Sequence, residues 1–192
     1  VVLVYPGAFN SYVGMGRELL HTFPGLHEWL AGFSADPAAL YQARKIFPPE
    51  ARTASDAEQQ QMQEALVSSP LSMLFSGTAI AGLYTHLLQA GFGIRADAAL
   101  GYSMGETAML FATGFWTKAD AVKDELAALP LFHTRLAGPL DAVREHWLAQ
   151  EQAVPEGTAP FWDNHIVMTT AEKALPVIAA ESQVYLTHIN AP

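Results

Sequence analysis

The pattern of apolar residues at the N-terminus predicts a buried strand followed by several short helices. Residues 1–5 are apolar and mostly β-branched, which is typical of a parallel strand that is buried on both faces. Pro6-Gly7 ends this strand. Apolar residues at helical spacing then predict helices over residues 14–21, 26–31, 37–46 and 56–66.

The stretch from Ala65 to Ile94 contains no formally charged residue and is long enough to cross a bilayer. However, serine, threonine, histidine and glutamine side chains interrupt it, and Pro70 stands where a helix would begin. We therefore interpret residues 71–89 as a helix buried against a sheet, and we expect no membrane segment. The Gly-Phe-Gly sequence at 91–93 ends this helix.

A second strand over residues 96–100 leads into the sequence Gly-Tyr-Ser-Met-Gly at 101–105, and a helical pattern begins at Glu106. In a Gly-x-Ser-x-Gly turn between a strand and a helix, the glycines allow a sharp bend that presents the serine. The helix N-terminus there favours developing negative charge. Ser103 is therefore a candidate nucleophile, and a purely structural glycine-rich turn is the alternative.

The pattern changes after Leu131. A helix is predicted over residues 139–148, followed by a polar loop and then a strand–helix–strand unit over residues 164–170, 171–181 and 184–189. Alternating strands and helices predict an α/β fold with a core over residues 1–131 and a smaller second part over residues 132–192. Ligands of such folds lie beyond the carboxyl ends of the strands, where Pro6 and Ser103 would both be found.

Composition narrows the possible functions. The chain has 192 residues, of which 51% are hydrophobic and 15% are charged, so we expect a compact globular protein. Its formal charge of −9 argues against binding to nucleic acid or to an anionic membrane. The absence of cysteine excludes disulfides, thiol catalysis and zinc–thiolate sites, and it fits the cytoplasmic location that we expect. No histidine pair has the spacing of a zinc helix, so no metal site is expected.

Three separated segments carry a more specific signal. Residues 5–16 read Tyr-Pro-Gly-Ala-Phe-Asn-Ser-Tyr-Val-Gly-Met-Gly, residues 101–106 read Gly-Tyr-Ser-Met-Gly-Glu, and residues 189–192 read Ile-Asn-Ala-Pro. Together they resemble the acyltransferase domains of the malonyl-CoA:acyl-carrier-protein transacylase family. The sequences of residues 106–116 and 131–147 look closest to polyunsaturated-fatty-acid synthases and enediyne-type iterative polyketide synthases. The chain would correspond to the N-terminal part of such a domain.

The resemblance implies both a fold and an activity. The fold would be a hydrolase-like layered parallel-sheet subdomain over residues 1–131, with the incomplete beginning of a small ferredoxin-like α+β subdomain over residues 132–192. The activity would be the transfer of an acyl group, malonyl by the subfamily resemblance, from coenzyme A to the phosphopantetheine thiol of an acyl carrier protein. Coenzyme A thioester is then a substrate, no cofactor stays bound, and neighbouring synthase domains are partners.

The same resemblance implies roles for individual residues. Ser103 would form the acyl-enzyme, and the backbone N–H groups of Met104 and Ala8 would form the oxyanion hole. Ala8 replaces the family's glutamine, which a backbone donor tolerates because it does not depend on the side chain. The residues expected to bind the substrate are Gly7, Phe9, Tyr102, Arg135 and Asn190.

Two departures from the family pattern affect the chemistry. Family members that select malonyl carry an arginine after the serine, whereas residues 126–129 here read Leu-Ala-Ala-Leu. Either the acyl group lacks a carboxylate, or Arg135, Lys123 or water holds it. The family's catalytic histidine lies well past the Asn-x-Pro turn, so we expect the base beyond Pro192.

Two other functions stay open at this point. In a serine esterase or thioesterase, Asp163 and His188 would follow Ser103 in the chain order of an α/β-hydrolase acid and base. Alternatively, the chain would be a non-catalytic docking segment of a megasynthase, with Ser103 vestigial.

Overall fold

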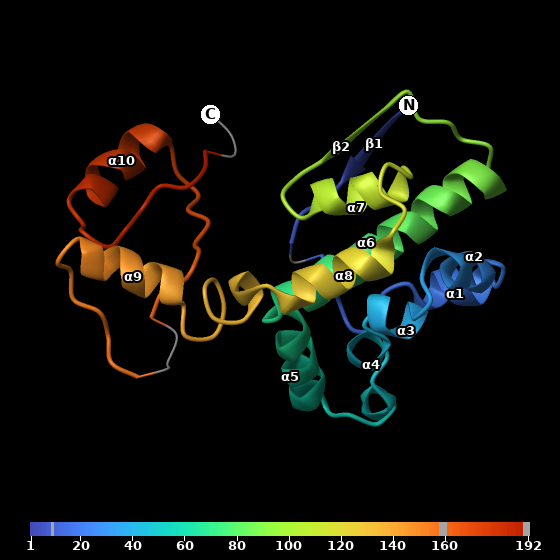
Figure 1. The fold of residues 1–192 in the computed structure, drawn as a ribbon, viewed down its shortest axis with the longest axis horizontal. Coiled ribbons are helices and arrows are strands. Elements are labelled where there is room, and N and C mark those ends of the chain that lie inside the picture. Colours follow the sequence, from blue (N-terminus) through green and yellow to red (C-terminus); the bar gives the residue numbers. More distant parts are fainter. Residues whose placement is uncertain (9, 158–160, 190–192) are drawn as a thin grey trace. The chain divides into compact units, whose positions relative to one another are not determined.

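The computed structural model describes residues 1–8, 10–157 and 161–189. The protein is mixed α/β and mostly helical, with one small parallel sheet in the described residues. It divides into two compact units, Val1–Leu129 and Pro130–Pro192. Figure 1 shows the order of the elements along the chain.

The sheet belongs to the first unit and joins β1 (Val2–Tyr5) to β2 (Ala98–Gly101) in parallel, with Tyr5 opposite Gly101. The two predicted strands are therefore confirmed. The prediction that the first strand is buried on both faces is wrong for the described chain, because Val4 is 65% exposed and Leu100, its partner in the register, is 50% exposed. Alternate residues point to opposite faces, so only the face carrying Tyr5 is covered.

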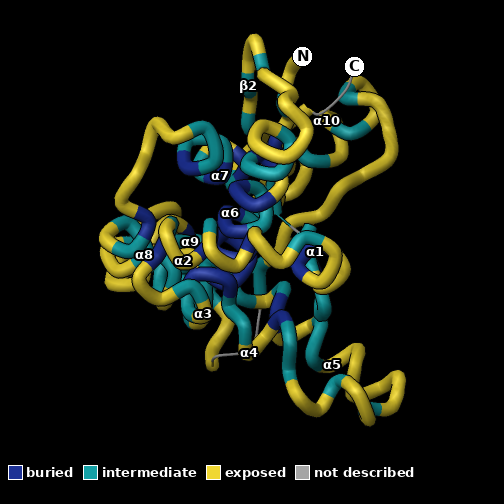
Figure 2. The backbone as a smooth tube through the Cα atoms, turned by 90° about the vertical axis from the view of Figure 1, so that its right-hand side faces the viewer, coloured by how far each residue is buried: buried dark blue, intermediate teal, exposed yellow. Residues whose placement is uncertain are grey.

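The central element of the first unit is α6 (Pro70–His86), which continues into the π-helical turn η2 (Leu87–Gly91). Ser69 caps its N-terminus by accepting a hydrogen bond from the Ser72 N–H, and Pro70 occupies the first helical position, where it loses no hydrogen bond. In the described chain, Pro70–Gly91 is the one helical stretch long and apolar enough to cross a membrane. Figure 2 shows α6 as a largely buried helix, which confirms its interpretation as a core helix.

Several helices pack around α6. The strongest contacts come from α7 (Gly105–Ala112), which also touches both strands, and further contacts come from α5 (Asp56–Val67) and α8 (Ala119–Ala128). The pattern of the sequence does not predict α8. The remaining elements of this unit are α1 (Arg17–Thr22), α2 (Leu26–Phe33), α3 (Pro37–Leu40), α4 (Ala43–Ile46) and η1 (Pro49–Arg52).

The helix predicted over residues 37–46 is interrupted. Gln42 has a φ of 55°, in the left-handed region, and this residue separates α3 from α4. Its side chain donates to the Ala39 carbonyl and accepts from the Ser72 hydroxyl, so two hydrogen bonds hold the break in place. An apolar periodicity shows which residues face the core, but it does not reveal such a break.

The second unit contains η3 (Pro130–Phe132), α9 (Asp141–Ala149) and α10 (Ala171–Ala179). Trp147 is its buried centre and donates from Nε1 to the Tyr185 hydroxyl at 3.1 Å. The strands predicted over residues 164–170 and 184–189 are not formed, and Met168 is 95% exposed. A strand needs a partner for its backbone groups, and neither segment has one among the described residues.

Candidate active site

Ser103 lies in a strained turn between β2 and α7. Its φ is 55°, a left-handed conformation that is uncommon for a residue with a side chain, that recurs at functional sites, and that Gln42, Leu140 and Glu151 also adopt. The turn is closed by two backbone hydrogen bonds, from the Gly105 N–H to the Tyr102 carbonyl at 2.8 Å and from the Glu106 N–H to the Ser103 carbonyl at 3.0 Å. The Ser103 side chain is exposed at the start of the helix.

The two glycines of this turn are required by close packing. A Cβ added to Gly101 would lie 2.3 Å from the Gly105 carbonyl oxygen, and one added to Gly105 would lie 2.2 Å from the carbonyl oxygen of Tyr5. Both distances are too short for any side chain. The carboxyl ends of β1 and β2 therefore meet the first turn of α7 in direct backbone contact, which fixes the position of Ser103.

The loop that follows β1 lies against the same turn. The Tyr102 N–H donates to the Tyr5 carbonyl at 3.0 Å, and a Cβ added to Gly7 would lie 3.1 Å from the Cβ of Ser103. Met104 immediately precedes α7, and Ala8 follows Gly7. The structure thus brings together the first-unit residues expected at the site, except Phe9, which lies outside the described residues together with Asn190.

The helix also sets the electrostatics around Ser103. The first N–H groups of α7 have no carbonyl partners within the helix, and the aligned peptide dipoles make this end partly positive. An oxygen that gains negative charge beside Ser103 is stabilised by this field. The arrangement suits attack on a carbonyl carbon.

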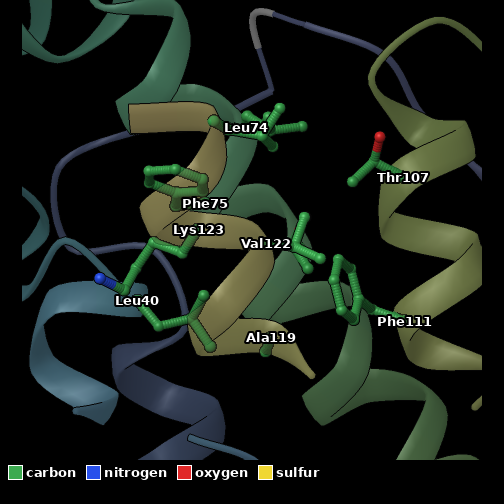
Figure 3. A pocket seen from close by; sticks show the side chains of 10 residues that line it. Leu40, Leu74, Phe75, Thr107, Phe111, Ala119, Val122 and Lys123 are labelled. Carbon is green, nitrogen blue, oxygen red and sulfur yellow. The ribbon is translucent and has the colours of Figure 1, made fainter. Parts of the chain in front are cut away.

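The two cations proposed to hold a carboxylate lie in other surroundings. Lys123 pairs with Asp124 at 2.5 Å and lines a separate cavity of about 10 Å³ between α3, α6, α7 and α8, with room for one water at most (Figure 3). Arg135 belongs to the second unit, where it donates two hydrogen bonds of 3.0 and 2.9 Å to Glu145. These hydrogen bonds raise the pKa of Arg135 and lower the pKa of Glu145.

The described part of the first unit brings no histidine to the serine. Its three histidines are His21, His27 and His86, and no described hydrogen bond joins any of them to Ser103. The ring of His86 instead stacks on Trp29 with centroids 5.2 Å apart.

Asp163 and His188 are exposed residues of the second unit, so their role in a hydrolase stays a prediction. No cluster of histidine and carboxylate residues suited to a metal ion occurs within the residues that the structure describes.

A cavity that the sequence did not predict lies beside this turn. It has a volume of about 380 Å³ and is bounded by β1, the loop at Gly7, α6 and Met104. Its α6 wall includes Gly77 and Thr78. The one feature of the sequence that marks this cavity is Gly77, a glycine inside an apolar helix. The cavity forms only in the folded chain, where residues of β1 and α6 both line it.

Comparisons with known proteins relate the chain to large synthases. It is 27% identical over 99% of its length to a polyunsaturated fatty acid synthase subunit of Thraustochytrium sp. and 27% identical over 87% to the reducing polyketide synthase Preu2 of Preussia isomera. Over 62% of its length it is 32% identical to the highly reducing polyketide synthase ctvA of Aspergillus terreus. The chain spans 9, 7 and 5% of these relatives, respectively.

No protein-family model matches the chain, and no solved structure matches it. The similarities support a synthase-related chain, as expected from the sequence motifs. They extend over the residues that contain the Ser103 turn in the relative that covers 99% of the chain.

Proposed function

We propose that this chain carries the nucleophile of an acyltransferase in a polyketide or polyunsaturated-fatty-acid synthase. The observation that carries the proposal is the backbone of Ser103, which is held at a φ of 55° by glycine contacts at the end of β2 and the start of α7. Strain of this kind persists only where the surrounding structure enforces it. At this position the exposed serine lies between the end of a strand and the start of a helix.

In the proposed reaction, the Ser103 Oγ attacks the carbonyl carbon of an acyl-coenzyme A. The tetrahedral oxyanion accepts hydrogen bonds from the backbone N–H groups of Met104 and Ala8. The C–S bond then breaks, coenzyme A leaves as the thiol, and an acyl-serine remains. In the second half, the phosphopantetheine thiol of a carrier protein attacks the acyl-serine, and Ser103 regains its proton as the thioester forms.

The reaction needs a base for the serine proton, and the resemblance implies a histidine beyond Pro192. Malonyl is the acyl group implied by the same resemblance. The carboxylate of a malonyl group would need a cationic partner or an ordered water, and Lys123 and Arg135, which pair with Asp124 and Glu145, are not assigned to it. No cofactor takes part.

The proposal is tested in the full-length protein by intact-mass measurement and peptide mapping after exposure to acyl-coenzyme A. We expect an acyl adduct on the peptide that contains Ser103, and no adduct in Ser103→Ala. Ser68→Ala is the matched control, because Ser68 is an exposed serine whose hydroxyl only caps a carbonyl at the end of α5. Adduct formation retained in Ser103→Ala would contradict the proposal. Release of coenzyme A without an adduct would favour the hydrolase, and no reaction would favour the docking segment.

A further inference from the structure

The cavity beside Ser103 has the size of a small-molecule site. Its volume of about 380 Å³ falls within the range of about 300–1,000 Å³ that is typical of ligand pockets. Leu3 and Tyr5 of β1 form one wall, and α6 forms the wall that faces them. Such a cavity leaves apolar surface without packing partners among the described residues, which a ligand would cover.

The lining of this cavity is suited to an uncharged ligand. None of the described residues that line it is aspartate, glutamate, lysine, arginine or histidine. Its polar groups are hydroxyls and the amide of Asn10, and the rest of the surface is mainly aliphatic, aromatic or methionine side chains. A carboxylate placed here would lose its hydration without gaining a cationic partner.

The cavity extends to the nucleophile turn. Gly7 and Met104 both line it, and these residues flank Ser103: Gly7 in space and Met104 in sequence. Met104, one of the two residues whose backbone N–H is expected to hold the oxyanion, therefore lies at the border of the cavity. An acyl group on Ser103 has this space within reach.

The helix wall of the cavity contains Gly77 among larger side chains such as Met73. Gly77 lies inside α6, where glycine destabilises a helix relative to alanine. A Cβ on Gly77 would find its nearest described neighbour, the Oδ1 of Asn10, at 3.8 Å, so no clash with a described residue requires glycine here. Gly82 differs, because a Cβ there would lie 2.5 Å from the Trp29 ring. Packing explains Gly82, whereas open volume in the cavity explains Gly77.

One polar group on this wall has no partner in the described chain. Thr78 is only 3% exposed, lines the cavity, and its Oγ1 makes no hydrogen bond to any described residue. The neighbouring hydroxyl of Thr85 is paired with the Tyr5 hydroxyl at 2.8 Å. Buried hydroxyls are normally hydrogen-bonded, but Thr78 Oγ1 is shielded from solvent and Thr78 also borders the small cavity of Figure 3, so its unpaired hydroxyl does not identify a ligand atom.

We propose that this cavity holds the hydrocarbon part of an uncharged acyl group that is transferred through Ser103. This inference rests on the proposed function and specifies its substrate class. The transfer chemistry is unchanged: the Ser103 Oγ–acyl bond forms as the acyl C–S bond breaks, and coenzyme A leaves as the thiol. A neutral acyl chain is preferred over a carboxylated one.

The first test compares loading of the full-length protein with hexanoyl-coenzyme A and malonyl-coenzyme A in single-turnover experiments. Gly77→Leu fills the cavity with a good helix former. Gly32→Leu is the matched control, since Gly32 is an exposed glycine of α2 with no neighbour within 4 Å of an added Cβ. We expect hexanoyl loading to exceed malonyl loading, and Gly77→Leu alone to lower hexanoyl loading about tenfold or more.

The second test measures binding without catalysis, by calorimetry of S-hexanoyl-pantetheine with Ser103→Ala. We expect binding, and about tenfold weaker binding when Gly77→Leu is added. An absence of binding overturns this inference, and so does an equal effect of the two leucine variants.

The outcomes separate the two proposals. Malonyl loading on Ser103 that is faster than hexanoyl loading overturns the substrate class but leaves the acyltransferase intact. If no thioester loads Ser103, the proposed function fails, and this inference fails with it. Selective loss of hexanoyl loading in Gly77→Leu supports both.

Discussion

Gly7 and Ser103 are in contact across the turn, because a Cβ built on Gly7 would lie 3.1 Å from the Cβ of Ser103. The two residues are far apart in sequence and meet because β1 and β2 run parallel and end at the same edge. This contact aligns the loop after the first strand with the serine turn after the second. It also leaves no spare room between them.

The contact predicts the effect of Gly7→Ala. The added methyl group would lie 3.0 Å from the Tyr102 carbonyl oxygen as well as 3.1 Å from Ser103, so the serine turn must shift. Because a small misplacement of a nucleophile has a large kinetic effect, we expect acyl loading to fall about ten- to hundredfold. Single-turnover loading measures this. Gly25→Ala is the control, because no atom of a described residue lies within 4 Å of its added Cβ. Equal loading by both variants would contradict the predicted shift of the turn.

Gly105→Ala tests the packing that holds the turn. Its Cβ would lie 2.2 Å from the Tyr5 carbonyl oxygen, and backbone cannot move aside as a flexible side chain can. We expect the free energy of unfolding to fall by about 1–3 kcal/mol or more, as for other overpacked sites. Urea denaturation gives this value. A variant as stable as Gly32→Ala would show that the direct contact between β1 and α7 is absent.

A buried leucine and an exposed leucine are predicted to differ in how much stability is lost when each is truncated to alanine. Leu83 of α6 is fully buried, so Leu83→Ala should lower the free energy of unfolding by about 2–5 kcal/mol. Leu100 is half exposed on the open face of the sheet, so Leu100→Ala should change it by no more than about 0.5 kcal/mol. Urea denaturation of both variants provides the comparison. A large loss for Leu100→Ala would mean that the sheet face is covered in solution.

Asp120 predicts a dependence of stability on pH. Its carboxylate accepts a hydrogen bond from the Ser34 hydroxyl at 2.5 Å and another from the Ala35 N–H at 2.7 Å, which tie α8 to the start of α3. The Ser34 hydrogen bond, followed by that of Ala35, lowers the pKa of Asp120. The folded pKa therefore lies below the unfolded value of about 3.9, so the stabilisation is present above that pH and is lost as the pH falls through the folded pKa.

We expect Asp120→Asn to reduce this acid-dependent loss of stability, by less than about 1 kcal/mol because solvent screens the group. Unfolding midpoints measured from pH 6 downward, in about one-unit steps, would reveal the difference. Glu125→Gln, an exposed change on the same helix, is the control. Identical pH profiles for the wild type and Asp120→Asn would contradict this assignment.

The local elements of the first unit were largely predictable from the sequence, because each has a strong local signal. The apolar runs at β1 and β2 predict strands, and Pro70 after a serine cap predicts the start of α6. The glycines of the Ser103 turn predict a sharp strand-to-helix bend, and the structure has one. The role of Ser103 as a nucleophile stays a prediction.

Other features depend on contacts that no local pattern contains. Gln42 breaks a predicted helix through hydrogen bonds that include one from Ser72, which is distant in sequence. Residues 164–170 have the apolar content of a strand, yet Ile166 and Met168 are exposed and no strand forms there. The cavity at Gly77 is lined by residues of both β1 and α6, which are distant in sequence. Pairing and packing, which set these features, are properties of the whole fold.

The central claim is that Ser103 carries an acyl group, and peptide mapping of the full-length protein after exposure to acyl-coenzyme A tests it most directly. We predict a mass increase equal to the acyl group on the peptide containing Ser103, present in the wild type and in Ser68→Ala but absent in Ser103→Ala. An adduct that persists in Ser103→Ala, or that maps to another residue, would contradict the claim.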